Sequence, residues 1–240
     1  MQFNIFRRKM GLITTQLAAY PLVQRLYRWT KRLILTLFLA HLAYTILLIW
    51  FPVVSTPTIF GQWFSGKPIY KEWVALDKIS EPMQRAVVAS EDQEFEDHFG
   101  FDIDAIEKAL KYNKTHKKKK GASTISQQVA KNVFLWQDRT WLRKGAEVYC
   151  TFWIELLWSK ERILEVYLNV AEMGNGTFGC EAAAKRFFVK SAAKLTEQDA
   201  ALIAACLPNP IKYRADKPSD YVRQRQRAIL FQMAQIEDKQ

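Results

Sequence analysis

Apolar residues recur every three to four positions along most of the chain from about Trp73 onward, a spacing typical of helices with one buried face. No convincing alternation of a strand follows residue 80, so the sequence predicts a mainly α fold. Residues that cap helix N-termini mark the predicted helix starts at Ser80, Asp102, Thr124, Thr140, Ser159 and Thr196. The later predicted helices end near Trp158, Asn169, Phe188, Leu207 and Ile236.

The longest uncharged apolar segment is Leu33–Phe51, which has 19 residues and ends before Pro52. At about 1.5 Å per residue, this segment is long enough to cross a hydrocarbon core of about 30 Å. It starts late and lacks a small-residue cleavage site at its end, which argues against a cleaved signal peptide. The sequence therefore predicts a transmembrane helix at residues 33–52.

Basic residues without any acid precede this segment, which predicts a cytoplasmic N-terminal region at residues 1–32. Prolines and glycines then indicate a linker at residues 53–72, and residues 73–240 form the predicted extracytoplasmic domain. His41 lies in the middle of the predicted span, where a neutral histidine facing lipid or a neighbouring helix is favoured over a proton relay.

The composition excludes a disordered chain, because 49% of the residues are apolar and eight are tryptophan. The formal net charge of +11 indicates an anionic partner: a nucleic acid, a membrane surface or a phosphate-bearing substrate. The predicted membrane span argues against nucleic acid. Three widely spaced cysteines form no zinc or disulfide pattern, so we expect small core residues at Cys150, Cys180 and Cys206.

Five carboxylates and one imidazole gather in Glu91–His98, directly after the apolar face of the helix predicted over Met83–Ser90. Carboxylates beside apolar groups often have a raised pKa, which suits a general base. The alternative is a solvated acidic helix end, and the cluster taken alone does not decide between them.

Two later segments place polar groups on helix faces. Thr124 and Gln127 fit a capping box, and the free N–H groups of that helix start would suit a phosphate. Arg143 and Glu147 are four residues apart and share a face, as in an ordinary helix ion pair. The basic segment Lys111–Lys120 is either a solvated turn or an arm that attracts phosphates or lipid headgroups.

The order and spacing of these segments resemble the motif series of the family 51 peptidoglycan glycosyltransferases, which polymerise lipid II. The resemblance covers about residues 65–235 and rests on Glu91-Asp92-x-x-Phe95-x-x-His98-x-Gly100, Gly121-x-Ser123-Thr124-Ile125-x-Gln127-Gln128-x-x-Lys131-Asn132, Arg143-Lys144-x-x-Glu147, Lys160-x-x-Ile163-Leu164-Glu165-x-Tyr167-Leu168-Asn169 and Gly176 to Pro210. Mild departures from the family pattern are Ala122, Ser126 and Phe178. The resemblance implies a lysozyme-like helical glycosyltransferase domain with a smaller membrane-associated jaw lobe. Because no transpeptidase domain follows in this sequence, we expect the monofunctional Gram-negative class of the family.

The family pattern also implies roles for individual residues. Glu91 matches the catalytic base, and Glu147 matches a second essential glutamate that orients cations or the pyrophosphate. The implied substrate-binding residues are Ser123, Thr124, Gln127, Gln128, Lys131 and Arg143. Asp92 is the implied ligand of a divalent cation, Mg or Mn, and no organic cofactor is expected.

The implied reaction is inverting transfer of the growing undecaprenyl-diphosphate glycan chain onto the 4-hydroxyl of lipid II, which makes a β-1,4 glycan for the cell wall. We expect a single-pass protein of the inner membrane with a periplasmic catalytic domain, and cell-wall synthesis or division proteins as further partners. Two alternatives are a glycan-cleaving lytic transglycosylase or hydrolase, and a non-enzymatic membrane-anchored scaffold that binds lipid or glycan. A glycan-cleaving enzyme needs a general acid but no lysine–arginine anion site, so the cations favour a phosphorylated donor.

Overall fold

The computed structural model describes residues 21–116, 119–138 and 140–237 of the chain. The chain divides into two compact units, Met1–Leu47 and Leu48–Gln240. The first twenty residues of the predicted cytoplasmic region lie outside the described residues, as do Lys117 and Lys118 of the basic segment.

The described part of the first unit is one helix, α2 (Pro21–Leu47). Within the described residues it is the one helix that is long and apolar enough to cross a membrane, by length and composition. It begins before the predicted Leu33 because arginine and lysine are good helix formers, so the helix continues through the charged segment. The helix indicates single-pass membrane anchoring.

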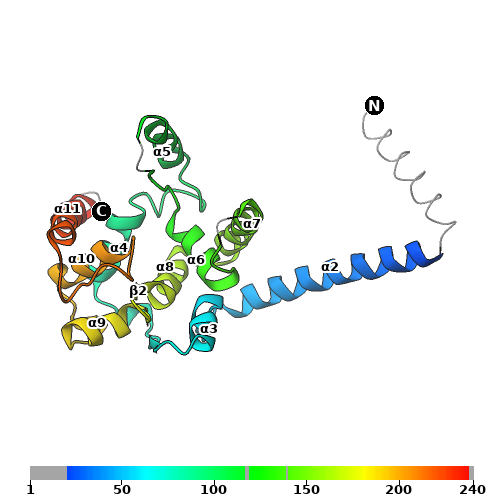
Figure 1. Ribbon diagram of the computed structural model, residues 1–240, viewed down its shortest axis with the longest axis horizontal. Helices are drawn as coiled ribbons and strands as arrows, with labels where there is room; N and C mark the ends of the chain where they lie inside the picture. Colours follow the sequence, from blue (N-terminus) through cyan, green and yellow to red (C-terminus); the bar gives the residue numbers. More distant parts are fainter. Residues whose placement is uncertain (1–20, 117–118, 139, 238–240) are drawn as a thin grey trace. The chain divides into compact units, whose positions relative to one another are not determined.

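Helices make up most of the second unit (Figure 1), which confirms the prediction of a mainly α fold. They are α3 (Pro57–Phe64), α4 (Glu81–Glu91), α5 (Ile103–Thr115), α6 (Ile125–Phe134), α7 (Trp141–Leu157), α8 (Lys160–Val170), α9 (Cys180–Phe188), α10 (Glu197–Cys206) and α11 (Asp220–Glu237). Two single-turn 3-10 helices, η1 (Leu76–Lys78) and η2 (Ala192–Lys194), connect them.

The predicted capping residues start these helices. Each accepts a hydrogen bond from a backbone N–H of the first turn, which confirms the six predicted helix starts at Ser80, Asp102, Thr124, Thr140, Ser159 and Thr196. The capping box of Thr124 and Gln127 is confirmed, and Thr196 and Asp199 form a second one. Local hydrogen-bonding chemistry therefore determines where most of the helices begin.

Two features were not predicted. The segment expected to be a linker contains α3, whose N-terminus is capped by Thr56 and which has Pro57 in its first turn. Three short strands form a small sheet in the order β1-β3-β2, with β1 (Tyr70–Lys71) parallel to β3 (Thr177–Phe178) and β2 (Glu172–Gly174) antiparallel to it. Strands of two or three residues are too short to show an alternating pattern in a sequence. The boundaries of the predicted domains otherwise stay predictions.

Two groups of packed helices contribute to the hydrophobic core. Helix α10 packs against α4 and α11, and α6 packs against α7 and α8. As expected, the three cysteines are buried free thiols. Burial raises the pKa of Cys150, Cys180 and Cys206 to about 12, so they stay protonated at neutral pH.

Helix α5 differs from the other long helices of this unit because it contains no buried residue. It stands at the edge of the unit in Figure 1, away from the group of α4, α10 and α11. Its Lys108 and Tyr112 line a cavity between α5 and the end of α4. The packed helices therefore form one wall of this cavity, and an exposed helix forms another.

Candidate active site

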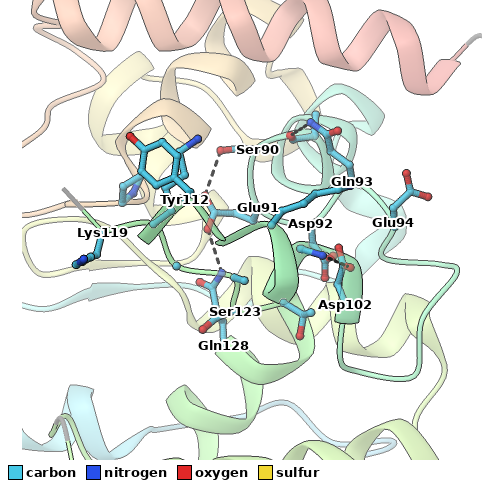
Figure 2. A pocket seen from close by; sticks show the side chains of 18 of the residues that line it. Ser90, Glu91, Asp92, Gln93, Glu94, Asp102, Tyr112, Lys119, Ser123 and Gln128 are labelled. Carbon is cyan, nitrogen blue, oxygen red and sulfur yellow. Dashed lines mark hydrogen bonds between the residues drawn. The ribbon is translucent and has the colours of Figure 1, made fainter. Parts of the chain in front are cut away.

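The cavity of about 760 Å³ next to α5 contains Glu91 (Figure 2). Glu91 is the last residue of α4, because the backbone of Asp92 leaves the helical conformation with a φ of −165°. The preceding turns of α4 bury their apolar side chains, which holds the helix end in place. Ser123, Thr124 and Gln128 line the same cavity, so it collects several residues of the predicted site.

Each oxygen of the Glu91 carboxylate accepts a hydrogen bond. Nε2 of Gln128 donates to Oε2 at 3.0 Å, and the hydroxyl of Ser90 donates to Oε1 at 3.1 Å. The amide of Gln128 is itself oriented, because the Tyr167 hydroxyl donates to its Oε1 at 3.3 Å. Burial raises the pKa of Tyr167 well above its usual value, and the charges of Glu91 and Asp92 add to this shift. Tyr167 therefore remains a donor at neutral pH.

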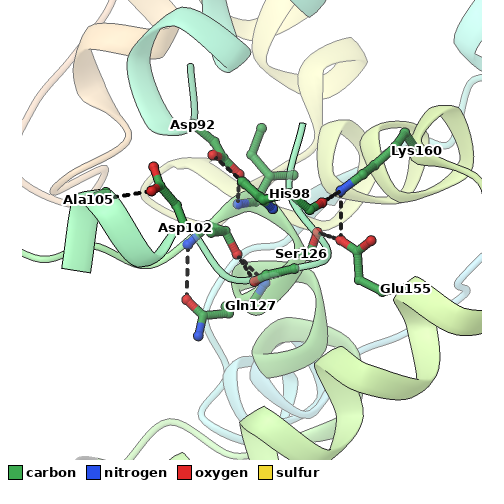
Figure 3. Close-up of polar contacts among 11 residues, drawn as sticks. Asp92, His98, Asp102, Ala105, Ser126, Gln127, Glu155 and Lys160 are labelled. Atoms are coloured by element: carbon green, nitrogen blue, oxygen red, sulfur yellow. Dashed lines mark hydrogen bonds and ion pairs between the residues drawn. The ribbon is translucent and has the colours of Figure 1, made fainter. Parts of the chain in front are cut away.

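Asp92 joins the end of α4 to the start of α6 (Figure 3). Its Oδ2 accepts the backbone N–H of Ile125 at 2.9 Å, and its Oδ1 lies 2.9 Å from Nε2 of His98. Burial raises the pKa of Asp92, although the hydrogen bonds from His98 and Ile125 oppose this shift. Asp92 belongs to the lining of the cavity that contains Glu91, but its side chain is only 2% exposed because protein groups contact both of its oxygens.

The start of α6 has few free donors for a phosphate. Ile125 donates its backbone N–H to Asp92, and Gln127 donates its backbone N–H to the Thr124 hydroxyl oxygen. The Thr124 hydroxyl donates to the carbonyl of Gly100 at 2.7 Å. Thr124 and Gln127 thus hold the helix start, contrary to our expectation of a phosphate bound at free N–H groups there, and their role in substrate binding stays a prediction. Ser123 is exposed at the cavity.

Gly100 is needed for the turn that Thr124 contacts. Its φ of +76° is a conformation that other residues rarely adopt, and a Cβ there would lie 2.7 Å from Cγ2 of Thr151. Behind this turn, Ser126 and Lys160 both bind the buried Glu155 (Figure 3), with Nζ of Lys160 at 3.0 Å. The turn is therefore fixed from both sides.

Lys131 lies on α6, one turn beyond Gln127. It lines a second cavity of about 470 Å³, which shares Gln128 and Pro208 with the cavity of Glu91. Within the described part of the chain, the half-buried ammonium of Lys131 has no hydrogen-bond or ion-pair partner. A cation in this position is available to an anion.

The electrostatic surroundings of Lys131 connect the two halves of the predicted site. Burial lowers the pKa of the Lys131 ammonium. The negative charge of Glu147 opposes this shift, and so does that of Glu91. The positive charges of Arg143 and Lys144 add to it. The charges of both the candidate base and the charged cluster of α7 therefore affect the pKa of Lys131.

That charged cluster consists of Arg143, Lys144 and Glu147. The buried Glu147 carboxylate forms ion pairs with both cations, one through each oxygen. Nε of Arg143 is buried and has no hydrogen-bond partner among the residues that the structure describes. The i,i+4 pair of Arg143 and Glu147 agrees with the sequence spacing, whereas no role had been assigned to Lys144, whose i,i+3 spacing gives the same signal. None of the three lines the two cavities above.

The basic segment contributes to the first cavity through Lys119 and Lys120. The Asn113 side chain fixes Lys120, because it accepts the backbone N–H of Lys120 at 2.7 Å and donates to its carbonyl at 2.9 Å. Nζ of Lys120 lies 4.2 Å from the ring centre of Tyr112. The described part of this segment therefore adds positive charge to the cavity wall.

Comparison with known proteins identifies the family. The family model described as transglycosylase matches residues 58–234. The chain belongs to the transglycosylase family. The domain of this family is lysozyme-like, so that part of the fold prediction is confirmed as well.

Curated relatives within the family match over most of their length. A biosynthetic peptidoglycan transglycosylase of Bdellovibrio bacteriovorus is 51% identical over 219 residues, which are 88% of this chain and 87% of the relative. A protein of the same name from Klebsiella oxytoca is 55% identical over 78% of this chain and 78% of the relative. Another from Yersinia pseudotuberculosis is 48% identical over 90% of this chain and 93% of the relative.

No individual role was assigned from the sequence to three residues near the candidate base Glu91: Tyr167, Ser90 and Arg225. Tyr167 was noted only as part of a motif, and Ser90 and Arg225 were given no role. Ser90 precedes Glu91 directly, so its contact could have been foreseen. The contact of Nη2 of Arg225 with Oγ of Ser90, at 3.2 Å, joins residues 135 positions apart, and no local pattern indicates it.

Proposed function

We propose that this glycosyltransferase polymerises lipid II into β-1,4 glycan strands for peptidoglycan synthesis. Membership in the transglycosylase family and the name of its relatives support glycan chain polymerisation. The observation that carries the proposal is a carboxylate and a cation on neighbouring cavities, the cation having no partner among the described residues. Gln128 lines both cavities, Glu91 lines the first, and Lys131 lines the second.

In the proposed reaction, the 4-hydroxyl of the acceptor sugar attacks the anomeric carbon of the donor. Glu91 accepts the hydroxyl proton as the new C–O bond forms, and the bond from the anomeric carbon to the lipid pyrophosphate breaks. Attack opposite the leaving group converts an α-linked donor into a β-linked product. Hydrogen bonds from Gln128 and Ser90 hold the carboxylate for this step.

The leaving pyrophosphate needs positive charge more than it needs a proton. Lys131 supplies a cation without an ion-pair partner among the described residues. Arg143 is held by Glu147, and its buried Nε, which has no partner in the described part of the chain, can donate to an acceptor. This distribution of charge favours a phosphorylated donor over the glycan-cleaving alternative, which would need a general acid at the sugar oxygen.

A divalent cation stays a prediction that the residues present do not favour. Both oxygens of Asp92, the residue assigned to it, already accept hydrogen bonds. Among the described residues, no three histidine, cysteine, aspartate or glutamate side chains gather in a group that could hold a metal ion.

The same proposal places the protein in the inner membrane, with its N-terminus cytoplasmic and its catalytic domain periplasmic. The apolar helix α2 and the basic residues 1–32 support this orientation. Exposed aromatic side chains also occur on the second unit: Trp63 of α3 is 62% exposed and Trp141 of α7 is 92% exposed. Such residues suit a membrane interface, where the lipid-linked substrate resides. Division or elongation proteins remain predicted partners.

Glycan synthesis from purified lipid II tests the proposal, with the full chain reconstituted in detergent micelles or vesicles. Wild type should make glycan strands, and Glu91→Gln should make none while keeping the wild-type unfolding temperature. Glu96→Gln is the matched control, because Glu96 is exposed and lies outside the cavity lining. Polymer formation by Glu91→Gln would refute the assignment of the base. Shortened products from finished glycan strands would instead favour the lytic alternative.

A further inference from the structure

The C-terminal helix α11 reaches the candidate base through one side chain. Helix α11 packs against α4 and α10 and is anchored by the buried residues Val222, Ile229 and Met233. From this anchored helix, Arg225 extends to the wall of the cavity that contains Glu91. Its Nη2 donates to Oγ of Ser90 at 3.2 Å, and Ser90 directly precedes Glu91.

This contact determines how the Ser90 hydroxyl is oriented. Because Oγ accepts a hydrogen bond from the guanidinium, the single hydroxyl proton is free to point elsewhere. Two acceptors lie within reach: Oε1 of Glu91 at 3.1 Å and the carbonyl of Ala204 at 3.4 Å. The carboxylate is closer, and hydrogen bonds to an ionised acceptor are about twice as strong as neutral ones. The proton therefore points to Glu91.

We propose that Arg225 and Ser90 are positioning residues for the base, and this inference rests on the proposed role of Glu91. Arg225 fixes Ser90, and Ser90 holds one oxygen of the carboxylate while Gln128 holds the other. The carboxylate is thereby held from two sides, by α6 through Gln128 and by α11 through the Arg225–Ser90 pair. Its plane is fixed relative to the cavity before substrate binds.

Two other roles for Arg225 make different predictions. If Arg225 bound an anionic group of the substrate, its loss would mainly raise KM. If it only stabilised α11, its loss would lower the unfolding temperature and leave kcat per folded molecule unchanged. A positioning residue affects the chemical step, so its loss lowers kcat with little change in KM.

The experiment measures initial rates of glycan synthesis from lipid II by the full chain and its variants. Arg225→Met and Ser90→Ala should each lower kcat about tenfold, because small misplacement of a catalytic group is costly. The double variant should also lose about tenfold rather than a hundredfold, since both residues act through one contact chain. Arg225→Lys keeps a cationic donor and should recover part of the loss. Arg223→Met, at an exposed arginine of the same helix, should match wild type.

The outcomes separate this inference from the proposed function. Loss of activity in Glu91→Gln together with wild-type kcat in Arg225→Met would overturn the inference and leave the proposed function intact. Multiplying effects in the double variant, or a change in KM alone, would also overturn it. If Glu91→Gln kept its activity, the proposed role of Glu91 as the base would be refuted, and the inference about Arg225 and Ser90 with it.

Discussion

Nε2 of Gln128 lies 3.0 Å from Oε2 of Glu91, and the buried Tyr167 hydroxyl holds the other end of the same amide by donating to its Oε1 at 3.3 Å. Without the hydroxyl, Oε1 of Gln128 loses this donor, and the amide that donates to Glu91 is held less firmly. The base therefore depends on a tyrosine that lines the second cavity and not the first.

Tyr167→Phe should lower kcat about fivefold, because a neutral hydrogen bond contributes about 1 kcal/mol and this one acts on the base. KM should stay the same, since the hydroxyl is buried and already bonded to Gln128. Initial rates of lipid II polymerisation measure the effect. Tyr149→Phe removes a hydroxyl from the exposed side of α7 and is the control. An unchanged kcat in Tyr167→Phe would show that the amide orientation does not depend on this hydroxyl.

Lys131 should produce an alkaline limit of activity. Burial lowers the pKa of its ammonium, so the charge is lost at a lower pH than for an ordinary lysine. As pH rises through this lowered pKa, the pyrophosphate loses its cation and the rate falls. Lys131→Met should lower kcat/KM by about a hundredfold at neutral pH. Lys131→Arg, if active, should extend activity to higher pH, because a guanidinium stays charged there.

The pH profile needs a control for a second lysine, Lys71, whose deprotonation could also reduce activity. Burial lowers the pKa of Lys71 to about 8, and its ammonium binds the carbonyls of Val53 and Val54. Its deprotonation would weaken the hold on this segment and would also lower the activity at alkaline pH. Lys71→Arg should leave the alkaline limit in place if Lys131 causes it. Loss of the limit in Lys71→Arg would assign it to the segment instead.

Asp92 should contribute to stability through hydrogen bonding rather than through charge. Burial raises its pKa, so the folded protein holds the proton more tightly than the unfolded chain does. Stability from this group is therefore greatest at low pH and falls as pH rises from the usual aspartate value through the raised one. Asp92→Asn removes the buried charge but keeps an acceptor for the Ile125 N–H.

Urea unfolding at pH 7 should consequently find Asp92→Asn at least as stable as wild type. Asp92→Ala leaves the Ile125 N–H without its partner and should lose about 1–3 kcal/mol. The same comparison repeated at pH 4 should reduce the advantage of the asparagine variant. An asparagine variant clearly less stable than wild type at pH 7 would mean that the carboxylate charge, paired with His98, outweighs its burial.

Val189, the residue that directly follows α9, should lower the stability of the domain through its backbone conformation. It has a φ of 55°, a left-handed conformation that disfavours a β-branched side chain, and its side chain is 92% exposed. The strain is about 1–2 kcal/mol, and glycine relieves it but adds flexibility to the unfolded chain. Val189→Gly should therefore raise the free energy of unfolding by up to about 1 kcal/mol in urea titrations. Val189→Ala keeps a Cβ and should gain less, so an equal gain would contradict the strain.

The sequence predicted most of the helical framework because its determinants are local. Thr124 and Gln127 are three residues apart, and their capping box follows from that spacing alone. The same holds for Arg143 and Glu147, whose ion pair requires only a continuous helix. Helix α3 was missed because prolines and glycines in its neighbourhood indicated a linker, although Thr56 and Pro57 also form a helix-start signal.

The contacts that organise the site could not be read from spacing. Asp92 and Ile125 are 33 residues apart, and only the tertiary fold brings the carboxylate at the end of α4 to the start of α6. That carboxylate takes the place where we had expected a phosphate. Arg225 and Ser90 are separated by more than half of the chain, so their contact is a property of the tertiary fold.

The exposure of α5 has a consequence for how this enzyme can vary. A helix without buried residues contributes little apolar burial to folding, so its side chains can be exchanged without redesign of the core. Yet α5 supplies Lys108 and Tyr112 to the wall of the cavity that contains Glu91. Natural variation and protein engineering can therefore change the wall of the cavity formed by α5 without changing the packed helix α4 that carries Glu91.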